Sequence, residues 1–186
     1  GQLGDGTGVD RLVPTRIGTQ SWKSVAAGSA SACAVRSDDT LWCWGNNNQG
    51  RLGDGTTIQR NAPVQVGTST WKDVDIDEHA CAVRGDDTLW CWGRNGTGEL
   101  GDGTTVDRTT PVQVGAATWK FVTVGRFFSC GATTAKGDLF CWGRNNVGQL
   151  GDGTTTNRLL PTKVNHLTPW QGVDAGEDFV AGLLDR

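Results

Sequence analysis

A motif that recurs at a nearly constant spacing constrains this chain more than any other feature. The sequence Leu-Gly-Asp-Gly-Thr occurs four times, beginning at Leu3, Leu52, Leu100 and Leu150. The spacing between copies is therefore 49, 48 and 50 residues. A second motif, Leu-Trp-Cys-Trp-Gly, begins at Leu41 and Leu89 and returns as Leu-Phe-Cys-Trp-Gly at Leu139. A fixed period of this length is typical of propellers and solenoids, in which each unit buries its faces against its neighbours.

Each unit contains four short segments that predict β-strands. The first begins at a tryptophan (Trp22, Trp71, Trp119 or Trp170), and the last is opened by a proline (Pro14, Pro63, Pro111 or Pro161). Four short strands with glycine-rich turns and no helical periodicity predict the blade of an all-β propeller. The expected units are a partial blade at 1–21, repeats at 22–70, 71–118 and 119–169, and a second partial blade at 170–186.

The segment 41–44 is apolar at every position, although successive side chains of a strand point to opposite faces. Such a strand is buried on both sides, as it is in a blade that lies between two others. We therefore expect most of the nine tryptophans to lie in the core.

The four motifs in register, Cys-Ala-Val-Arg, Asp-Asp-Thr-Leu-Trp-Cys-Trp-Gly, Leu-Gly-Asp-Gly-Thr and Pro-x-x-Val, resemble the repeat of the regulator-of-chromosome-condensation family. The resemblance covers the whole chain and implies a seven-bladed β-propeller in the intact protein. It also implies functions of individual members: nucleotide exchange on a small GTPase with chromatin docking, and β-lactamase inhibition by a secreted bacterial relative. No residue here matches an exchange site, so no catalytic residue is carried over.

The six cysteines form one pair in each complete repeat: Cys33 and Cys43, Cys81 and Cys91, Cys130 and Cys141. In an antiparallel hairpin that turns near Asp38, Cys33 and Cys43 face each other at a distance that a disulfide tolerates. Three cross-strand disulfides are favoured over reduced core thiols. They are also favoured over a zinc site, because the spacing is not Cys-x-x-Cys and the chain has only two histidines. Disulfides predict an oxidising compartment, extracellular or periplasmic, for a bacterial secreted type with paired cysteines.

Each aspartate of the Leu-Gly-Asp-Gly motif is followed six residues later by an arginine. The pairs are Asp5 and Arg11, Asp54 and Arg60, Asp102 and Arg108, Asp152 and Arg158. One aspartate per loop is too few for a calcium site, so we predict ion pairs that hold the loops and no metal. Asn47, Asn95 and Asn145, which follow the Trp-Gly pairs, are expected to form turns.

Function is expected where the units differ, because the shared positions are explained by blade formation. The window just before the first cysteine reads Ser29–Ser31 in one unit and differs in the other three. We predict that it lies on one rim and binds a protein through nine candidate residues: Asp77, Glu78, His79, Arg126, Phe127, Phe128, Glu177, Asp178 and Phe179.

We therefore expect a non-catalytic, protein-binding propeller that is secreted or located at the cell surface. One alternative is a structural repeat module of a larger surface protein. Another is a carbohydrate-acting enzyme, which would need two carboxylates among Asp77, Glu78, Glu177 and Asp178 within about 9 Å of each other.

Other functions are disfavoured by composition. The net charge is −3 and the basic residues are scattered, which disfavours nucleic acid as a partner. No apolar run is long enough to insert into a membrane, and no cofactor motif is present. A seven-unit ring needs about 340 residues at this period. We therefore expect a segment of a longer propeller that associates through its incomplete end blades.

Overall fold

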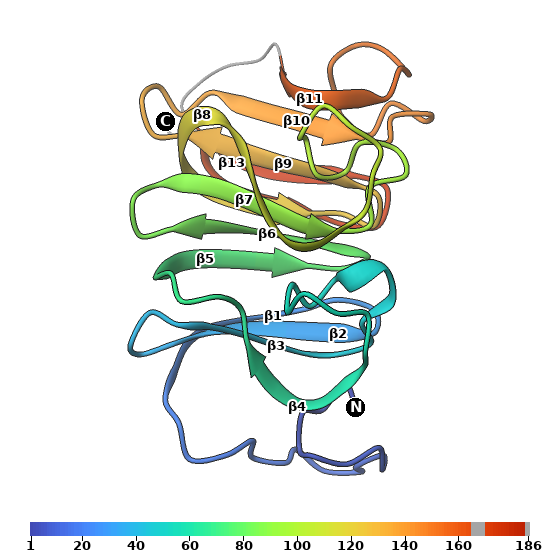
Figure 1. Cartoon of the computed structure of the whole chain (residues 1–186). Helices are drawn as coiled ribbons and strands as arrows, with labels where there is room; N and C mark the ends of the chain where they lie inside the picture. Colours follow the sequence, from blue (N-terminus) through green and yellow to red (C-terminus); the bar gives the residue numbers. More distant parts are fainter. Residues whose placement is uncertain (165–169, 185–186) are drawn as a thin grey trace.

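The computed structural model describes residues 1–164 and 170–184, and its strands form stacked antiparallel sheets (Figure 1). The first sheet has four strands in sequence order: β1 (Trp22–Ala27), β2 (Ser31–Arg36), β3 (Leu41–Gly45) and β4 (Arg60–Gln65). A three-residue 3₁₀ turn, η1 (Asn48–Gly50), lies in the loop between β3 and β4. This sheet has the strand order expected of a propeller blade.

The next two units share one long strand and so form a single sheet of seven strands. In sequence order these strands are β5 (Trp71–Ile76), β6 (His79–Arg84), β7 (Thr88–Gly93), β8 (Arg108–Val124), β9 (Phe128–Thr133), β10 (Leu139–Gly143) and β11 (Arg158–Lys163). The first part of β8 pairs with β7, and its last part, from Trp119 to Val124, pairs with β9. Strands β12 (Trp170–Ala175) and β13 (Val180–Leu184) form a two-stranded sheet that begins a further blade. The prediction of an all-β fold built from propeller blades is confirmed.

The core lies between the sheets, as the doubly apolar strands predicted. Trp92 of β7 is fully buried against Leu52 and Val66 of the first unit, and Trp142 of β10 is buried in the same way against Leu100 and Val114. Each side chain therefore joins two neighbouring units through apolar burial, the main favourable term in folding.

Not every tryptophan is interior. Trp42 and Trp90 are half-buried beneath the guanidinium groups of Arg36 and Arg84, which lie 4.1 and 3.5 Å from the ring centroids. These arginines cover apolar surface that solvent would otherwise reach.

All three predicted cysteine pairs are disulfide-bonded in the structure. Cys33 lies opposite Cys43, Cys81 opposite Cys91, and Cys130 opposite Cys141 in the β-ladders. Every sulfur lies in the buried interior of its own blade. In the chain-entropy model a loop this short gives roughly 2–3 kcal/mol of stability per bridge.

The proline-led strands need a correction. Strands β4, β8 and β11 begin at Arg60, Arg108 and Arg158, each three residues before the proline expected to open them. Each proline falls within a register shift, between two paired residues of its strand, so its missing N–H coincides with an interruption of the ladder. Pro14 lies in no strand, because the described chain offers it no neighbouring strand to pair with.

Candidate functional site

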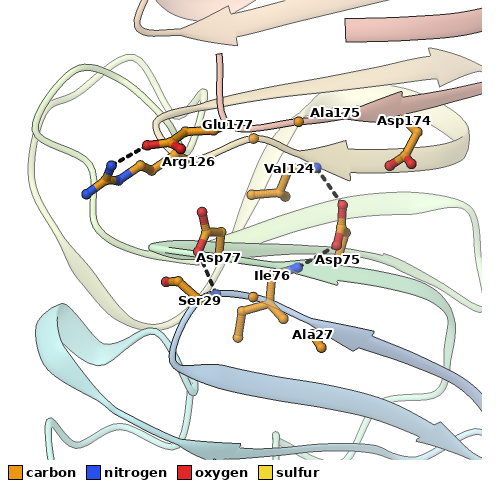
Figure 2. Close-up of a pocket in the computed structure, with 13 residues that line it drawn as sticks. Ala27, Ser29, Asp75, Ile76, Asp77, Val124, Arg126, Asp174, Ala175 and Glu177 are labelled. Carbon is orange, nitrogen blue, oxygen red and sulfur yellow. Dashed lines mark hydrogen bonds and ion pairs between the residues drawn. The ribbon is translucent and has the colours of Figure 1, made fainter. Parts of the chain in front are cut away.

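The first strands of the four units converge at one end of the stack. Strands β1, β5, β8 and β12 end around an open cavity of about 510 Å³ (Figure 2). The turns that follow these strands line its mouth, and they contain the variable window identified in the sequence. The cavity wall carries four carboxylates and one guanidinium: Asp75, Asp77, Asp174, Glu177 and Arg126.

Asp75 is the most perturbed of these carboxylates. Burial raises its pKa to about 6, against the opposing effect of the hydrogen bonds that it accepts. Its Oδ2 accepts hydrogen bonds from the backbone N–H of Val124 at 2.7 Å and from the Thr123 hydroxyl at 3.1 Å. The Thr123 hydroxyl in turn accepts from the backbone N–H of Ala175 at 3.0 Å. Asp75 thus links the first strands of three units, β5, β8 and β12, a role that we did not predict.

Ion pairs and a hydrogen bond connect the variable turns to neighbouring units. Arg126 forms an ion pair with Glu177, which raises the pKa of the guanidinium through a hydrogen bond and charge attraction. Glu78 forms an ion pair with Arg51, whose side chain is buried. Asp77 accepts a hydrogen bond from the backbone N–H of Ser29 at 3.0 Å. The rim is therefore held together by contacts between units.

Phe127 lies at the centre of the most distinctive surface feature of this rim. Its half-buried ring has three guanidinium groups around it, with ring-centroid distances of 4.7 Å for Arg94, 5.1 Å for Arg126 and 5.5 Å for Arg144. We call these four residues the Phe127 cluster. Arg94 also pairs with the buried Glu99 at 3.2 Å. The two Nη groups of Arg144 contact no acceptor in the described residues, while its Nε donates to Asn146 at 2.7 Å.

Two of the nine predicted rim residues are interior residues. His79 and Phe128 are the first residues of β6 and β9, and each lies opposite a glycine of the next strand, Gly93 or Gly143. Both side chains point between the units and are fully buried. The expectation that they face a partner is therefore wrong, because the window extends one residue into the strand.

His79 takes part in a buried hydrogen-bonded chain. Its Nε2 lies 2.6 Å from the hydroxyl oxygen of Ser129, which itself donates to the backbone carbonyl of Glu99 at 2.9 Å. Because the Ser129 hydroxyl donates its proton to this carbonyl, His79 Nε2 must carry a proton and donate it to the serine oxygen. His79 therefore does not act as a base toward Ser129. Burial lowers the pKa of His79 to about 4, which keeps the ring neutral.

The other predicted residues lie at the surface in different settings. Glu177, Asp178 and Phe179 are exposed, and Glu78 is half-buried beside Arg51. Of the carboxylates proposed for an enzyme, Asp77 and Glu177 line the same cavity, and each is held by a contact described above. The residues that the structure describes contain no group of three or more histidine, cysteine or acidic side chains that could hold a metal ion.

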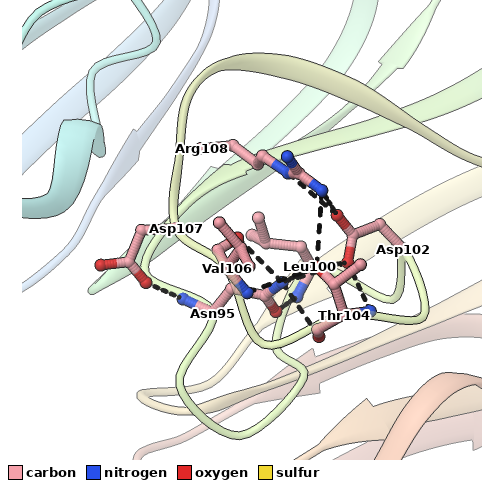
Figure 3. Close-up of polar contacts among 7 residues, drawn as sticks. All are labelled: Asn95, Leu100, Asp102, Thr104, Val106, Asp107 and Arg108. Atoms are coloured by element: carbon pink, nitrogen blue, oxygen red, sulfur yellow. Dashed lines mark hydrogen bonds and ion pairs between the residues drawn. The ribbon is translucent and has the colours of Figure 1, made fainter.

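The repeated loops lie on the same rim, and their ion pairs are as predicted. Asp102 pairs with Arg108 at 2.8 Å (Figure 3). The other three Asp–Arg pairs form in the same way. Burial alone would raise the pKa of Asp102, but hydrogen bonds from Thr104 and Arg108 outweigh it and hold the pKa below its ordinary value.

The asparagine of each loop has a larger role than the predicted one of forming a turn. Asn95 is fully buried, and its Nδ2 lies 3.1 Å from both Asp102 Oδ1 and the Thr104 carbonyl, and 3.2 Å from the Val106 carbonyl (Figure 3). Its Oδ1 accepts from the backbone N–H of Leu100 at 3.0 Å. Asn47 and Asn145 make the corresponding contacts.

Stacked four-stranded blades with disulfide-bonded hairpins and asparagine-centred loops define a β-propeller repeat protein. The family model for the regulator of chromosome condensation (RCC1) repeat matches residues 38–82, 86–132 and 136–183. A second model of this repeat matches residues 22–51 and 119–149. The chain belongs to the RCC1 repeat family, as the sequence motifs indicated.

Solved structures agree on the fold. Human WBSCR16 is 21% identical with a TM-score of 0.85, and the match covers 98% of this chain and 51% of that one. Prp20p from Saccharomyces cerevisiae, described with its binding properties to Gsp1p and histones, is 20% identical with a TM-score of 0.84, covering 97% and 49%. The chain thus spans about half the length of these proteins. No curated protein matched it by sequence, and no helix in the described residues is long and apolar enough to cross a membrane.

Proposed function

We propose that this propeller is a non-catalytic protein-binding module of an oxidising compartment, extracellular or periplasmic, and that it recognises its partner through the Phe127 cluster. The observation that carries this proposal is an aromatic ring at the surface of one rim with three arginines around it. Aromatic and arginine side chains are the residue types most enriched at the centres of protein interfaces.

The charge of the cluster indicates the chemistry of the partner. Arg94 and Arg126 already form ion pairs with Glu99 and Glu177. The Nη groups of Arg144, in contrast, are unpaired in the described residues. A carboxylate of the partner can accept two parallel hydrogen bonds from such a fork while its apolar stem packs on Phe127. We therefore propose an acidic segment of a protein as the ligand.

The neighbouring contacts favour a preformed surface. Arg94 is held by Glu99, and Arg126 by Glu177, so two of the three arginines are already positioned before a partner binds. Less side-chain freedom is then lost on association. The three buried disulfides support the proposed compartment, because such bonds persist where the environment is oxidising.

The test is affinity capture from the secreted proteins of the producing cells, with the whole chain immobilised as bait. Phe127→Ala and Arg144→Ala should each reduce retention of the partner at least tenfold. Lys136→Ala is the matched control, because Lys136 is an exposed cation in the turn between β9 and β10, at the opposite end of the blade. Binding should also weaken as salt rises, since the contact is an exposed charge pair.

Two outcomes would count against the proposal. A partner that both variants retain as well as the wild type would show that binding lies elsewhere on the chain. A second outcome is that Phe127→Ala loses binding, Arg144→Ala does not, and binding does not depend on salt. That result would support protein recognition by the Phe127 cluster but refute an acidic ligand.

A further inference from the structure

An asparagine followed directly by a glycine occurs once in the 186 residues, at Asn95-Gly96. The equivalent asparagines of the other two complete units are each followed by a second asparagine, as Asn47-Asn48 and Asn145-Asn146. Glycine has no Cβ, so its backbone nitrogen is the least shielded one that can follow an asparagine. The second unit therefore differs from its neighbours at the place where an asparagine side chain can react with its own backbone.

The reaction open to this pair is closure of a succinimide ring. The backbone nitrogen of Gly96 attacks Cγ of Asn95, and the new N–Cγ bond replaces the Cγ–Nδ2 bond. The amide leaves as ammonia and takes up the proton of the Gly96 N–H. Water then opens the ring at either carbonyl and gives aspartate or isoaspartate. Water is the one co-reactant, so the step needs no enzyme and no oxidant.

The folded loop opposes this reaction at the side chain. Asn95 is fully buried, which shields its amide from water. Its Nδ2, the leaving group, donates to Asp102 and to the carbonyls of Thr104 and Val106 (Figure 3). Its Oδ1 accepts a backbone N–H of the same loop. Gly96 itself is exposed, so the protection of the pair rests on the contacts of the asparagine.

The three disulfides of the described chain leave this loop outside their rings. The bridges on either side of it join Cys81 to Cys91 and Cys130 to Cys141, and residues 94–107 lie between them in the sequence. The loop can therefore open while every bridge is intact. Local opening of this kind costs less free energy than global unfolding.

The product of the reaction cannot restore the loop. The Asn95 amide donates hydrogen bonds, whereas an ionised carboxylate only accepts them, so the carbonyls of Thr104 and Val106 would lose their donor. A carboxylate would also place a second negative charge beside Asp102 Oδ1, which lies 3.1 Å from Asn95 Nδ2. Isoaspartate adds a methylene to the backbone and displaces the loop further.

We propose that Asn95-Gly96 is a deamidation site that the folded loop protects and that unfolding exposes, and that the modified chain does not regain the native loop. Chemical modification of the unfolded state makes unfolding irreversible. The second unit thus limits how often the chain can unfold and recover, and the first and third units lack this limit because no glycine follows their asparagines.

The test holds the whole disulfide-bonded chain in a mildly alkaline buffer, with and without urea. Trypsin then releases residues 95–108, in which Asn95 is the sole asparagine, so mass spectrometry of this peptide measures conversion at the site. Conversion in urea should be at least tenfold faster than in native buffer. The yield of refolding after dilution, followed by tryptophan fluorescence, should fall in step with conversion.

Gly96→Asn is the matched variant, because it gives the second unit the Asn-Asn pair of the other two. The nearest atom to a Cβ at Gly96 is Arg94 Nη2 at 3.5 Å, an ordinary contact, so a side chain fits there. Asn95 of this variant should convert at least tenfold more slowly in urea, and the chain should refold in full. Wild-type chain kept in urea at mildly acidic pH, where ring closure is slow, should also refold in full.

Four outcomes would overturn the proposal. The first is equal conversion of Asn95 in native buffer and in urea, and the second is full refolding of converted chains. The third is equal conversion in the wild type and in Gly96→Asn. The fourth is an equal loss of refolding at acidic and alkaline pH, which would assign the irreversibility to aggregation.

Discussion

The repeated loops and the variable turns lie on the same rim, but they are built in opposite ways. In the loops, Asn47, Asn95 and Asn145 make matching hydrogen bonds to the same positions of their own units. In the turns, each unit makes a different contact, and most of these contacts reach a neighbouring unit. Contacts that recur unchanged in every unit stabilise the blade. The turns differ between units, so a binding property of one unit is expected there.

The sharpest test of this comparison is the adjacent pair Phe127 and Phe128, one in a turn and one in a strand. Phe128→Ala should lower the free energy of unfolding by about 4 kcal/mol, because a fully buried ring leaves a cavity. Phe127→Ala should cost less than about 1 kcal/mol, since its ring is partly solvated. Denaturant unfolding of both variants measures the difference, and equal losses would place both rings in the core.

The next largest effect is expected in the repeated loops. Asn95→Ala should cost about 3 kcal/mol, because it leaves several buried donors and acceptors without partners. Asn61→Ala, at an exposed position of β4, is the matched control and should be nearly neutral. A loss below about 1 kcal/mol for Asn95→Ala would mean that solvent replaces these contacts.

A third test uses Asp75 and His79 of the second unit, whose pKa values burial shifts in opposite directions. Protonation of His79 in the unfolded chain withdraws stability as pH falls from 6.5 toward its folded pKa of about 4. Protonation of Asp75 in the folded state adds stability as pH falls from about 6 toward 3.8. The two effects oppose each other in the wild type, so their sum changes its stability little over this range.

Asp75→Asn removes one of the opposing effects. Between pH 6.5 and 4 the free energy of unfolding of this variant should fall by about 2.5 kcal/mol more than that of the wild type, because the stabilising protonation of Asp75 is lost while the other carboxylates, Asp73 included, titrate in both proteins. Chemical denaturation at several pH values gives the slope. If the free energy of unfolding of the variant did not change with pH, burial would not lower the pKa of His79 in the folded chain.

The smallest effect is expected for the half-exposed arginines of the loops. Arg60→Ala, Arg108→Ala and Arg158→Ala should each cost about 1 kcal/mol, because solvent screens part of the charge pair. Near-equality of the three values matters more than their size. A large value in one unit only would show that the loops are not equivalent.

The sequence predicted much of the fold because a repeat reports the same constraint several times. The disulfide pairs followed from hairpin register, and the Asp–Arg pairs followed from a spacing that recurs four times. Features that occur in one unit only had no such support. Asp75 reads as an ordinary polar residue until its position beside Val124 and Thr123 is known.

Burial within the variable window was also beyond sequence reasoning. Phe127 and Phe128 are the same residue type in adjacent positions, and only the point where β9 begins decides which one enters the core. Strand boundaries are uncertain by more than one residue at the level of sequence, and a shift of one residue exchanges the two faces of a strand. His79 was misplaced for the same reason.

The buried amide of Asn95 has a consequence for how this protein can be produced. Asn95-Gly96-Thr97 is the sole acceptor pattern for N-linked glycans in the 186 residues. The nitrogen that would carry the sugar is the one that lies inside the loop against Asp102 and the Thr104 carbonyl. Glycan and folded loop exclude each other, so in a eukaryotic secretory host the second blade must fold before oligosaccharyl transfer. Replacing Thr97, rather than Asn95, would remove that competition and leave the loop intact.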